Sequence, residues 1–184
     1  MRGVGLLAVL LWSGVAHAGE LDVDVGLAAS TTAWPDDHGG GTTLDATWWF
    51  GGGWLGMSFV GKEQYARVDD RFLSYFSVNA AARQPIGKLR LAGRLGLVHQ
   101  HEEPRAAIMD QPIASLFGVA DGTRHRMAAR SEAQLALPFA RHGHGDWYVA
   151  LAIDGTVFGD EDRGPRWMIG AGLAVGLAYD FEAR

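Results

Sequence analysis

The feature of this sequence that most restricts its fold is a two-residue alternation between apolar and polar or small side chains. In the clearest run, residues 89–98, leucines occupy positions 89, 91, 95 and 97, and arginine, alanine, glycine or valine fill the remaining positions. Successive side chains of an extended strand point to opposite faces, so a period of two places these leucines together on one face. The run therefore predicts a β-strand with one apolar face.

Eight alternating segments follow one another, separated by stretches rich in glycine, proline and acidic residues. They span about residues 21–30, 42–50, 54–62, 71–83, 89–98, 126–137, 147–157 and 167–181. Eight antiparallel strands of about ten residues are enough to close a small barrel. Beyond the N-terminal residues, no stretch of about 18 apolar residues occurs, which excludes helical membrane spans. We predict an all-β chain that forms one eight-stranded antiparallel β-barrel.

The N-terminus has the composition of an export signal. Arg2 precedes an apolar run over residues 4–12, and the small residues Ala16 and Ala18 have the spacing that signal peptidase requires. The run is too short to span about 30 Å of hydrocarbon. We predict a signal peptide over residues 1–18, cleaved after Ala18, and a single β-barrel domain over residues 19–184.

Charge and cysteine content exclude further classes of protein. The formal net charge of −5 at pH 7 argues against a nucleic-acid partner. With no cysteine, an exported domain has no disulfides and must be held by its core or by a membrane.

The charged face of the strands indicates a lumen. Its few charges are interspersed with glycine, alanine and serine, as a narrow interior requires. Both signs occur in similar numbers, as expected where buried charges must be paired. The predicted network contains Asp22, Asp24, Asp45, Arg90, Arg94, Arg126, Arg130, Glu132 and Asp154. We therefore predict a transmembrane barrel with a polar, charge-paired lumen and an apolar face towards lipid.

Aromatic residues gather at the strand ends and predict two interfacial girdles, where amphipathic rings favour the lipid headgroup level. The girdle residues are Trp48, Trp54, Trp147, Tyr179 and Phe181 at the end nearer both termini, and Phe72, Trp167 and Phe158 at the other. Connections at this second end are mostly the longer ones, and the longest spans residues 101–123. Long external loops with short periplasmic turns are typical of outer-membrane barrels.

The last segment carries a resemblance to a known class of proteins. Residues 174–181 resemble the C-terminal assembly signal of bacterial outer-membrane proteins, with Gly176, Tyr179 and Phe181 in the expected places and Ala174 where a polar residue is usual. By architecture the whole mature chain resembles small outer-membrane barrels of the OmpA-barrel, OmpX and OmpW type. The resemblance implies a Gram-negative outer membrane, contact with its lipid and lipopolysaccharide, and insertion by the outer-membrane assembly machinery.

Enzyme chemistry finds little support in the strands. Lipid-modifying barrels resembling this one use a His-x-Ser pair, whereas His125 and Ser131 are separated by six residues, about 20 Å along a strand. We predict no enzymatic activity and no cofactor.

A histidine-rich cluster at the two roots of the long connection is the main candidate for a metal site. It comprises His99, His101, Glu102, Glu103 and His125. Such side chains bind divalent metals, but a solvated polar rim has the same composition, and we favour the rim and predict no metal.

The sequence leaves four possible functions open. We favour a structural, envelope-integrity or surface-interaction protein, because four lumen arginines with matching acids leave little open space. The alternatives are a narrow, porin-like channel for small solutes or ions, a lipid-modifying enzyme, and a soluble lipocalin-like binder.

Overall fold

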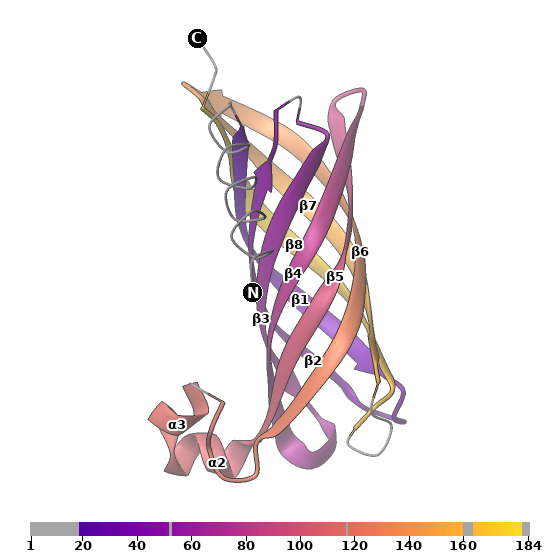
Figure 1. The fold of residues 1–184 in the computed structure, drawn as a ribbon, viewed down its shortest axis with the longest axis vertical. Coiled ribbons are helices and arrows are strands. Elements are labelled where there is room, and N and C mark those ends of the chain that lie inside the picture. The colour runs from indigo at the N-terminus through magenta and orange to yellow at the C-terminus, as the bar shows by residue number, and fades with distance from the viewer. Residues whose placement is uncertain (1–18, 52, 117, 160–163, 182–184) are drawn as a thin grey trace, which may run out of the picture.

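A computed structural model describes residues 19–51, 53–116, 118–159 and 164–181. The predicted signal peptide, residues 1–18, lies outside the described residues. Within them the chain forms eight strands in one closed antiparallel barrel (Figure 1). The strands are β1 (Glu20–Thr32), β2 (His38–Trp49), β3 (Leu55–Ala66), β4 (Arg71–Ile86), β5 (Leu89–Pro104), β6 (Arg124–His142), β7 (Gly145–Phe158) and β8 (Trp167–Asp180). The predicted fold class is confirmed.

The barrel closes by pairing of the first and last strands. Glu20 lies opposite Asp180, and the register continues without interruption to the pair Thr32 and Met168. Each other strand pairs with its neighbours in sequence, so every connection is a hairpin. Closure leaves no unpaired sheet edge, which is the condition for a sheet to stand in hydrocarbon.

The longest connection lies at the end opposite the chain's C-terminus (Figure 1). It holds two short helices, α2 (Arg105–Asp110) and α3 (Pro112–Leu116), which the alternation did not predict. A single 3₁₀ turn, η1 (Val68–Asp70), links β3 to β4. No helix in the described ranges is long and apolar enough to cross a membrane.

Several strands extend beyond the predicted segments. β2 begins at His38, not at about residue 42. It therefore includes glycines 39–41, which were predicted to lie in the loop between the first two strands. A Cβ at Gly39 would lie 1.6 Å from the carbonyl oxygen of Tyr65, and one at Gly41 would lie 1.9 Å from that of Glu63. The glycines therefore allow close approach of β3, a role of glycine within strands that local composition does not distinguish from a turn.

Two predicted turns are also shorter than expected. β4 runs through Pro85 to a tight turn at Gly87, which has φ 61°. β6 runs past Pro138 to a turn at Gly143, with φ 58°, and the register shifts between Pro138 and Ala140. The register shift accommodates the proline, and pairing continues to His142 and Gly145 where turn-forming residues predicted a loop.

Candidate functional site

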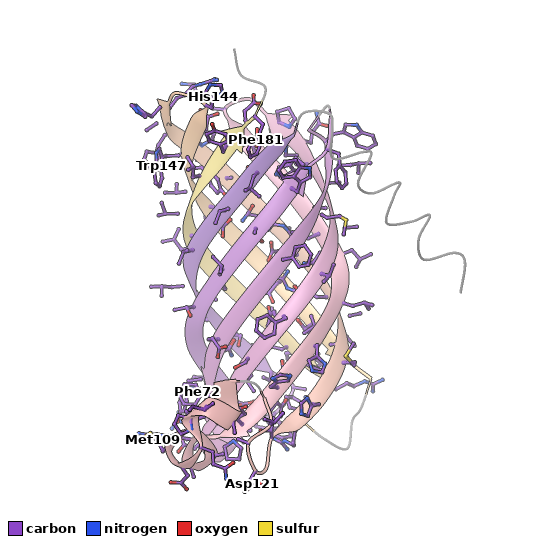
Figure 2. The ribbon with its side chains drawn as sticks, turned by 60° about the vertical axis from the view of Figure 1, so that its left-hand side comes forward. Phe72, Met109, Asp121, His144, Trp147 and Phe181 are labelled. Carbon is purple, nitrogen blue, oxygen red and sulfur yellow. The ribbon has the colours of Figure 1, made fainter. Side chains whose placement is uncertain are left out.

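The barrel has the reverse of the usual polarity of a soluble protein: its aliphatic side chains are exposed and its charged side chains are buried. Leu27 is 70% exposed and Leu95 67%, whereas Arg126 is 1% and Arg94 4% exposed. The aliphatic side chains project outwards around the middle of the barrel (Figure 2). An apolar surface of this extent is typical of a protein that contacts lipid or another apolar phase.

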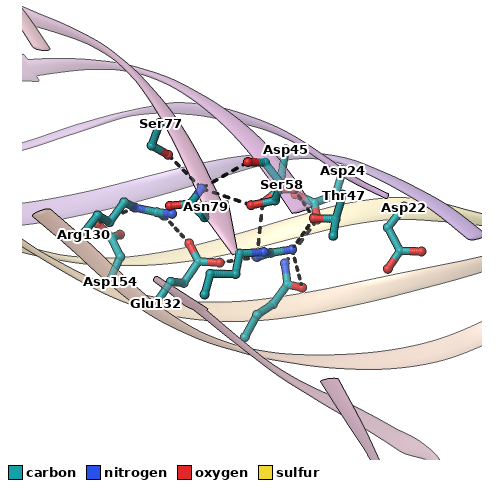
Figure 3. A network of polar contacts seen from close by, with 12 residues as sticks. Asp22, Asp24, Asp45, Thr47, Ser58, Ser77, Asn79, Arg130, Glu132 and Asp154 are labelled. Atoms are coloured by element: carbon teal, nitrogen blue, oxygen red, sulfur yellow. Dashed lines mark hydrogen bonds and ion pairs between the residues drawn. The ribbon is translucent and has the colours of Figure 1, made fainter. Parts of the chain in front are cut away.

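The central layer of the lumen is organised around Glu132. Its two carboxylate oxygens bind the guanidinium groups of Arg94 and Arg130, one to each (Figure 3). The Arg94 Nη1 atom also lies 3.1 Å from the Asp45 Oδ2 atom. The Arg130 Nε atom lies 3.8 Å from the Asp154 Oδ2 atom. Each arginine therefore has two acidic neighbours, and residues from opposite sides of the barrel are joined across it.

Neutral polar groups complete this layer. The Arg94 Nη2 atom donates to Thr47 at 3.1 Å and to the Gln134 Oε1 atom at 3.3 Å. Gln134 in turn donates to the Asp24 Oδ2 atom at 3.2 Å, which also accepts from the Tyr148 hydroxyl at 3.1 Å. These contacts satisfy part of the layer, as buried charges require, whereas the Arg94 Nε, Arg130 Nε and Arg130 Nη1 atoms have no hydrogen-bond partner among the described residues.

One cation in this layer was not predicted. The Lys62 Nζ atom lies 3.5 Å from the Asp154 Oδ1 atom, and its side chain is 1% exposed. Lys62 stands at the end of a predicted segment whose facing was poorly defined by alternation, although it shares the parity of Ser58 and Val60. That parity is the signal that places it in the lumen.

A second layer lies where β1 begins and β4 ends. The Glu20 carboxylate binds the guanidinium groups of Arg83 and Arg90. The Asp22 Oδ2 atom accepts a hydrogen bond of 2.8 Å from the indole of Trp49. The Arg83 guanidinium lies 4.5 Å from the centre of the Trp49 ring. The buried indole therefore donates a hydrogen bond to Asp22 and forms a cation–π contact with Arg83.

A third layer closes the opposite mouth and centres on Glu102, whose side chain is fully buried. Its carboxylate lies 2.9 Å from Arg71, 2.9 Å from Arg124 and 3.0 Å from Arg126. The Arg71 Nη2 atom continues the network to Asp37 at 3.1 Å. Of these residues only Arg126 was predicted to lie in the lumen. Glu102 and Arg124 belong to parts of β5 and β6 that lie beyond the predicted segments, and Arg71, the first residue of its segment, was not assigned to a face.

The Arg126 side chain also ties the connection between β7 and β8 across the mouth. Its Nη2 atom donates to the backbone carbonyl oxygen of Pro165 at 2.9 Å. Its guanidinium lies 3.9 Å from the centre of the Phe158 ring. Phe158 is only 4% exposed, so its prediction as an external girdle residue is wrong: β7 continues with the same alternation and turns this ring into the lumen.

Little space remains between the side chains of the central layer. A cavity bordered by Asp24, Asp45, Arg130 and Glu132 has a volume of about 30 Å³. That is room for on the order of one or two water molecules. The ion pairs and the small size of this cavity leave little room in the central layer.

The other girdle residues face outwards at the two ends of the barrel. Trp54 is 61% and Phe181 53% exposed, and the rings of Trp48 and Phe181 lie 5.3 Å apart. The remaining predicted girdle residues that face outwards are Trp147, Trp167, Tyr179 and the half-buried Phe72. Their place at the level of a lipid interface stays a prediction.

The C-terminal motif is divided between the two faces of β8. Tyr179 and Phe181 are outward and their ring centres lie 4.9 Å apart. Gly176 faces the lumen, where an added Cβ would lie 2.3 Å from the Tyr148 ring. Glycine at this position leaves room for a buried tyrosine.

The histidine-rich candidate cluster separates into two parts. Glu102 points into the lumen, and Glu103 lies by Thr123, 3.5 Å from its hydroxyl. His99, His101 and His125 come together on the outer surface of β5 and β6, with one nitrogen of each within 4.8 Å of the others.

Compared with known proteins, the sequence matches no family model and no curated protein. Twelve chains of solved structures match the fold, among them the following two. Neisserial surface protein A has a TM-score of 0.59 and 10% identity, over 89% of this chain and 97% of that one. Ail, the attachment invasion locus protein of Yersinia pestis in complex with the heparin analogue sucrose octasulfate, has a TM-score of 0.52 and 18% identity, over 90% of this chain and 100% of that one. The chain therefore has the eight-stranded barrel fold of these two proteins, as the resemblance predicted.

Proposed function

We propose that this chain is an integral protein of a Gram-negative outer membrane with a closed lumen, serving envelope integrity or surface interaction without enzymatic activity. The observation that carries the proposal is the reversed polarity: an aliphatic belt outside and paired charges inside. A lipid environment makes this polarity favourable, whereas water would solvate neither the belt nor the buried ions. Outer-membrane lipid and lipopolysaccharide are the proposed partners.

The route to the membrane belongs to the same proposal. The leader over residues 1–18 would direct export, and Gly176, Tyr179 and Phe181 would serve recognition by the outer-membrane assembly machinery. Surface interaction would fall to the helical connection between β5 and β6. Its Met109 and Ile113 side chains are each 75% exposed, which is typical of a contact surface.

The membrane assignment predicts that the protein requires detergent for extraction and migrates differently on gels before and after heating. It also predicts a position-dependent cost of charge. Leu151 is 60% exposed in the middle of β7, between Leu135 and Leu173. Leu151→Arg should lower the free energy of unfolding in lipid vesicles by about 2–4 kcal/mol, because it places a guanidinium in hydrocarbon.

Met109→Arg is the matched control, since Met109 is at least as exposed but lies in the connection beyond the belt. Its expected effect is within about 0.5 kcal/mol. A protein that stays in the soluble periplasmic fraction, or one in which the two variants are equally stable, would contradict the membrane assignment.

A closed lumen separates this proposal from the alternative of a narrow channel. The Glu132 ion pairs and the 30 Å³ cavity support closure. We expect no steady single-channel current from the purified protein in planar bilayers. Steady currents that Arg94→Ala or Arg130→Ala abolishes would favour the channel instead.

A further inference from the structure

Three imidazole rings form a compact group on the outer surface of the barrel, near its loop end. His101 lies directly opposite His125 in the β5–β6 register, and His99 stands two residues before His101 on the same face of β5. The ring centres of His101 lie 4.7 Å from those of both other histidines. The His99 Nε2 and His125 Nδ1 atoms are 3.5 Å apart. The pairing register of β5 and β6 therefore keeps the three rings in contact with one another on one face of the sheet.

No ordinary partner explains this group. Among the described residues, none of the three rings forms a salt bridge or hydrogen bond with a carboxylate; the contacts are between rings and to the Met127 sulfur, 3.2 Å from the His99 Nδ1 atom. The neutral imidazole is a common ligand of metal ions, and three of them at this spacing form a candidate ligand set.

The helical connection covers one side of the group. A Cβ at Gly118 would lie 1.9 Å from the His101 Nδ1 atom, and Gly118 has φ 65°. Its amide donates to the carbonyl oxygen of Ser115 in α3 at 2.8 Å, so Gly118 is held against the ring from the side of the helical connection. The connection leaves His125 exposed on the other side. The group is thus shielded on one side and open on the other.

We propose that His99, His101 and His125 bind a divalent late first-row transition metal, with Zn²⁺ as the representative ion. Zinc–imidazole bonds of about 2.0–2.1 Å in tetrahedral geometry require nitrogens about 3.4 Å apart. The three nitrogens already lie within 4.8 Å of one another, so side-chain rotations that move them by about 1 Å complete the site. Three histidines leave a fourth position for water or an external donor. Ca²⁺ and Mg²⁺, which require oxygen ligands, do not fit.

Titration calorimetry of the detergent-extracted, full-length protein, purified without a histidine tag, tests the site at pH 7.5 with ZnCl₂. We expect one zinc ion per chain. His101→Gln should weaken binding at least about tenfold, since the loss even of a group that only hydrogen-bonds to a metal ligand typically has an effect of this size. The triple glutamine variant should abolish binding. MgCl₂ should neither bind nor compete. Because the three side chains face outwards, all variants should retain heat-modifiable migration, which verifies their fold.

His142→Gln/His144→Gln is the matched control, because it removes two histidines from the hairpin at the other end of the barrel. Its zinc affinity should stay within about twofold of the unmodified protein, since a change below 0.5 kcal/mol is usual for surface substitutions. Unchanged binding in the folded triple variant, a loss of binding in the control, or the absence of zinc binding to the unmodified protein would each overturn the proposal. Visible spectra with Co²⁺ give an independent readout, because four-coordinate and hydrated cobalt absorb differently.

Discussion

Replacing Glu132 with glutamine is expected to lower the free energy of unfolding of the barrel by about 3–5 kcal/mol. The Glu132 carboxylate binds both Arg94 and Arg130, and its side chain is only 6% exposed. Glutamine keeps the shape but removes the charge, which leaves two guanidinium groups in a lumen that admits few water molecules. Urea denaturation of the protein in lipid vesicles, followed by gel mobility without heating, measures the change.

The control for this substitution is Glu63→Gln in β3. Glu63 is exposed and accepts a hydrogen bond of 2.6 Å from Ser74, so its change should stay within about 0.5 kcal/mol. Adding Arg130→Gln to the Glu132 variant should restore part of the lost stability, because it removes one of the two guanidinium groups that shared the lost carboxylate. Equal denaturation midpoints for the Glu132 and Glu63 variants would show that the central layer carries no net electrostatic stabilisation.

Replacing Glu102 with glutamine is expected to have an effect of similar size, about 3–5 kcal/mol, concentrated at the loop end. Glu102 is the common partner of Arg71, Arg124 and Arg126. Without its charge these arginines repel one another, and the strand ends that carry the helical connection should separate. Limited proteolysis of the folded protein should therefore cleave the connection over residues 105–123 faster, in addition to the loss measured in urea.

A double-variant cycle distinguishes this electrostatic effect from a packing defect. The Arg124 side chain is 35% exposed, so Arg124→Gln alone should cost much less than the loss of Glu102. Combined with Glu102→Gln, it should recover stability, since the two residues share one ion pair and their effects are not additive. A double variant as unstable as the sum of the single variants would contradict the charge argument.

The energetic role of the lumen charges follows from what surrounds them. A buried ion pair often contributes little compared with apolar residues of the same volume, because both ions lose their hydration. Removing one partner is costly for the same reason. The three layers around Glu132, Glu20 and Glu102 thus make the interior sensitive to single substitutions, and they join strands across the lumen with defined partners.

The facing of most side chains could be read from the sequence. Alternation is a local property of extended backbone, so the parity of Leu91 and Leu95 places them together whatever the strand pairs with. The same parity continues through His99 and His101 outside and through Glu102 inside. The predicted segment ended near residue 98, because glycines, prolines and acidic residues near the strand ends resemble turn residues. Those ends are extended because they pair with the neighbouring strands, which the local sequence does not show.

What the sequence by itself determined is the number of strands, their apolar and charged faces, and the sign balance of the lumen. What only the tertiary structure decided is which charges meet. Lys62 and Asp154 are 92 residues apart, and Arg94 meets Asp45 across the lumen. Such contacts depend on the closure and register of the barrel, which are properties of all eight strands together. The meeting of His99 and His101 with His125 has the same origin, since it requires the β5–β6 register as well as parity.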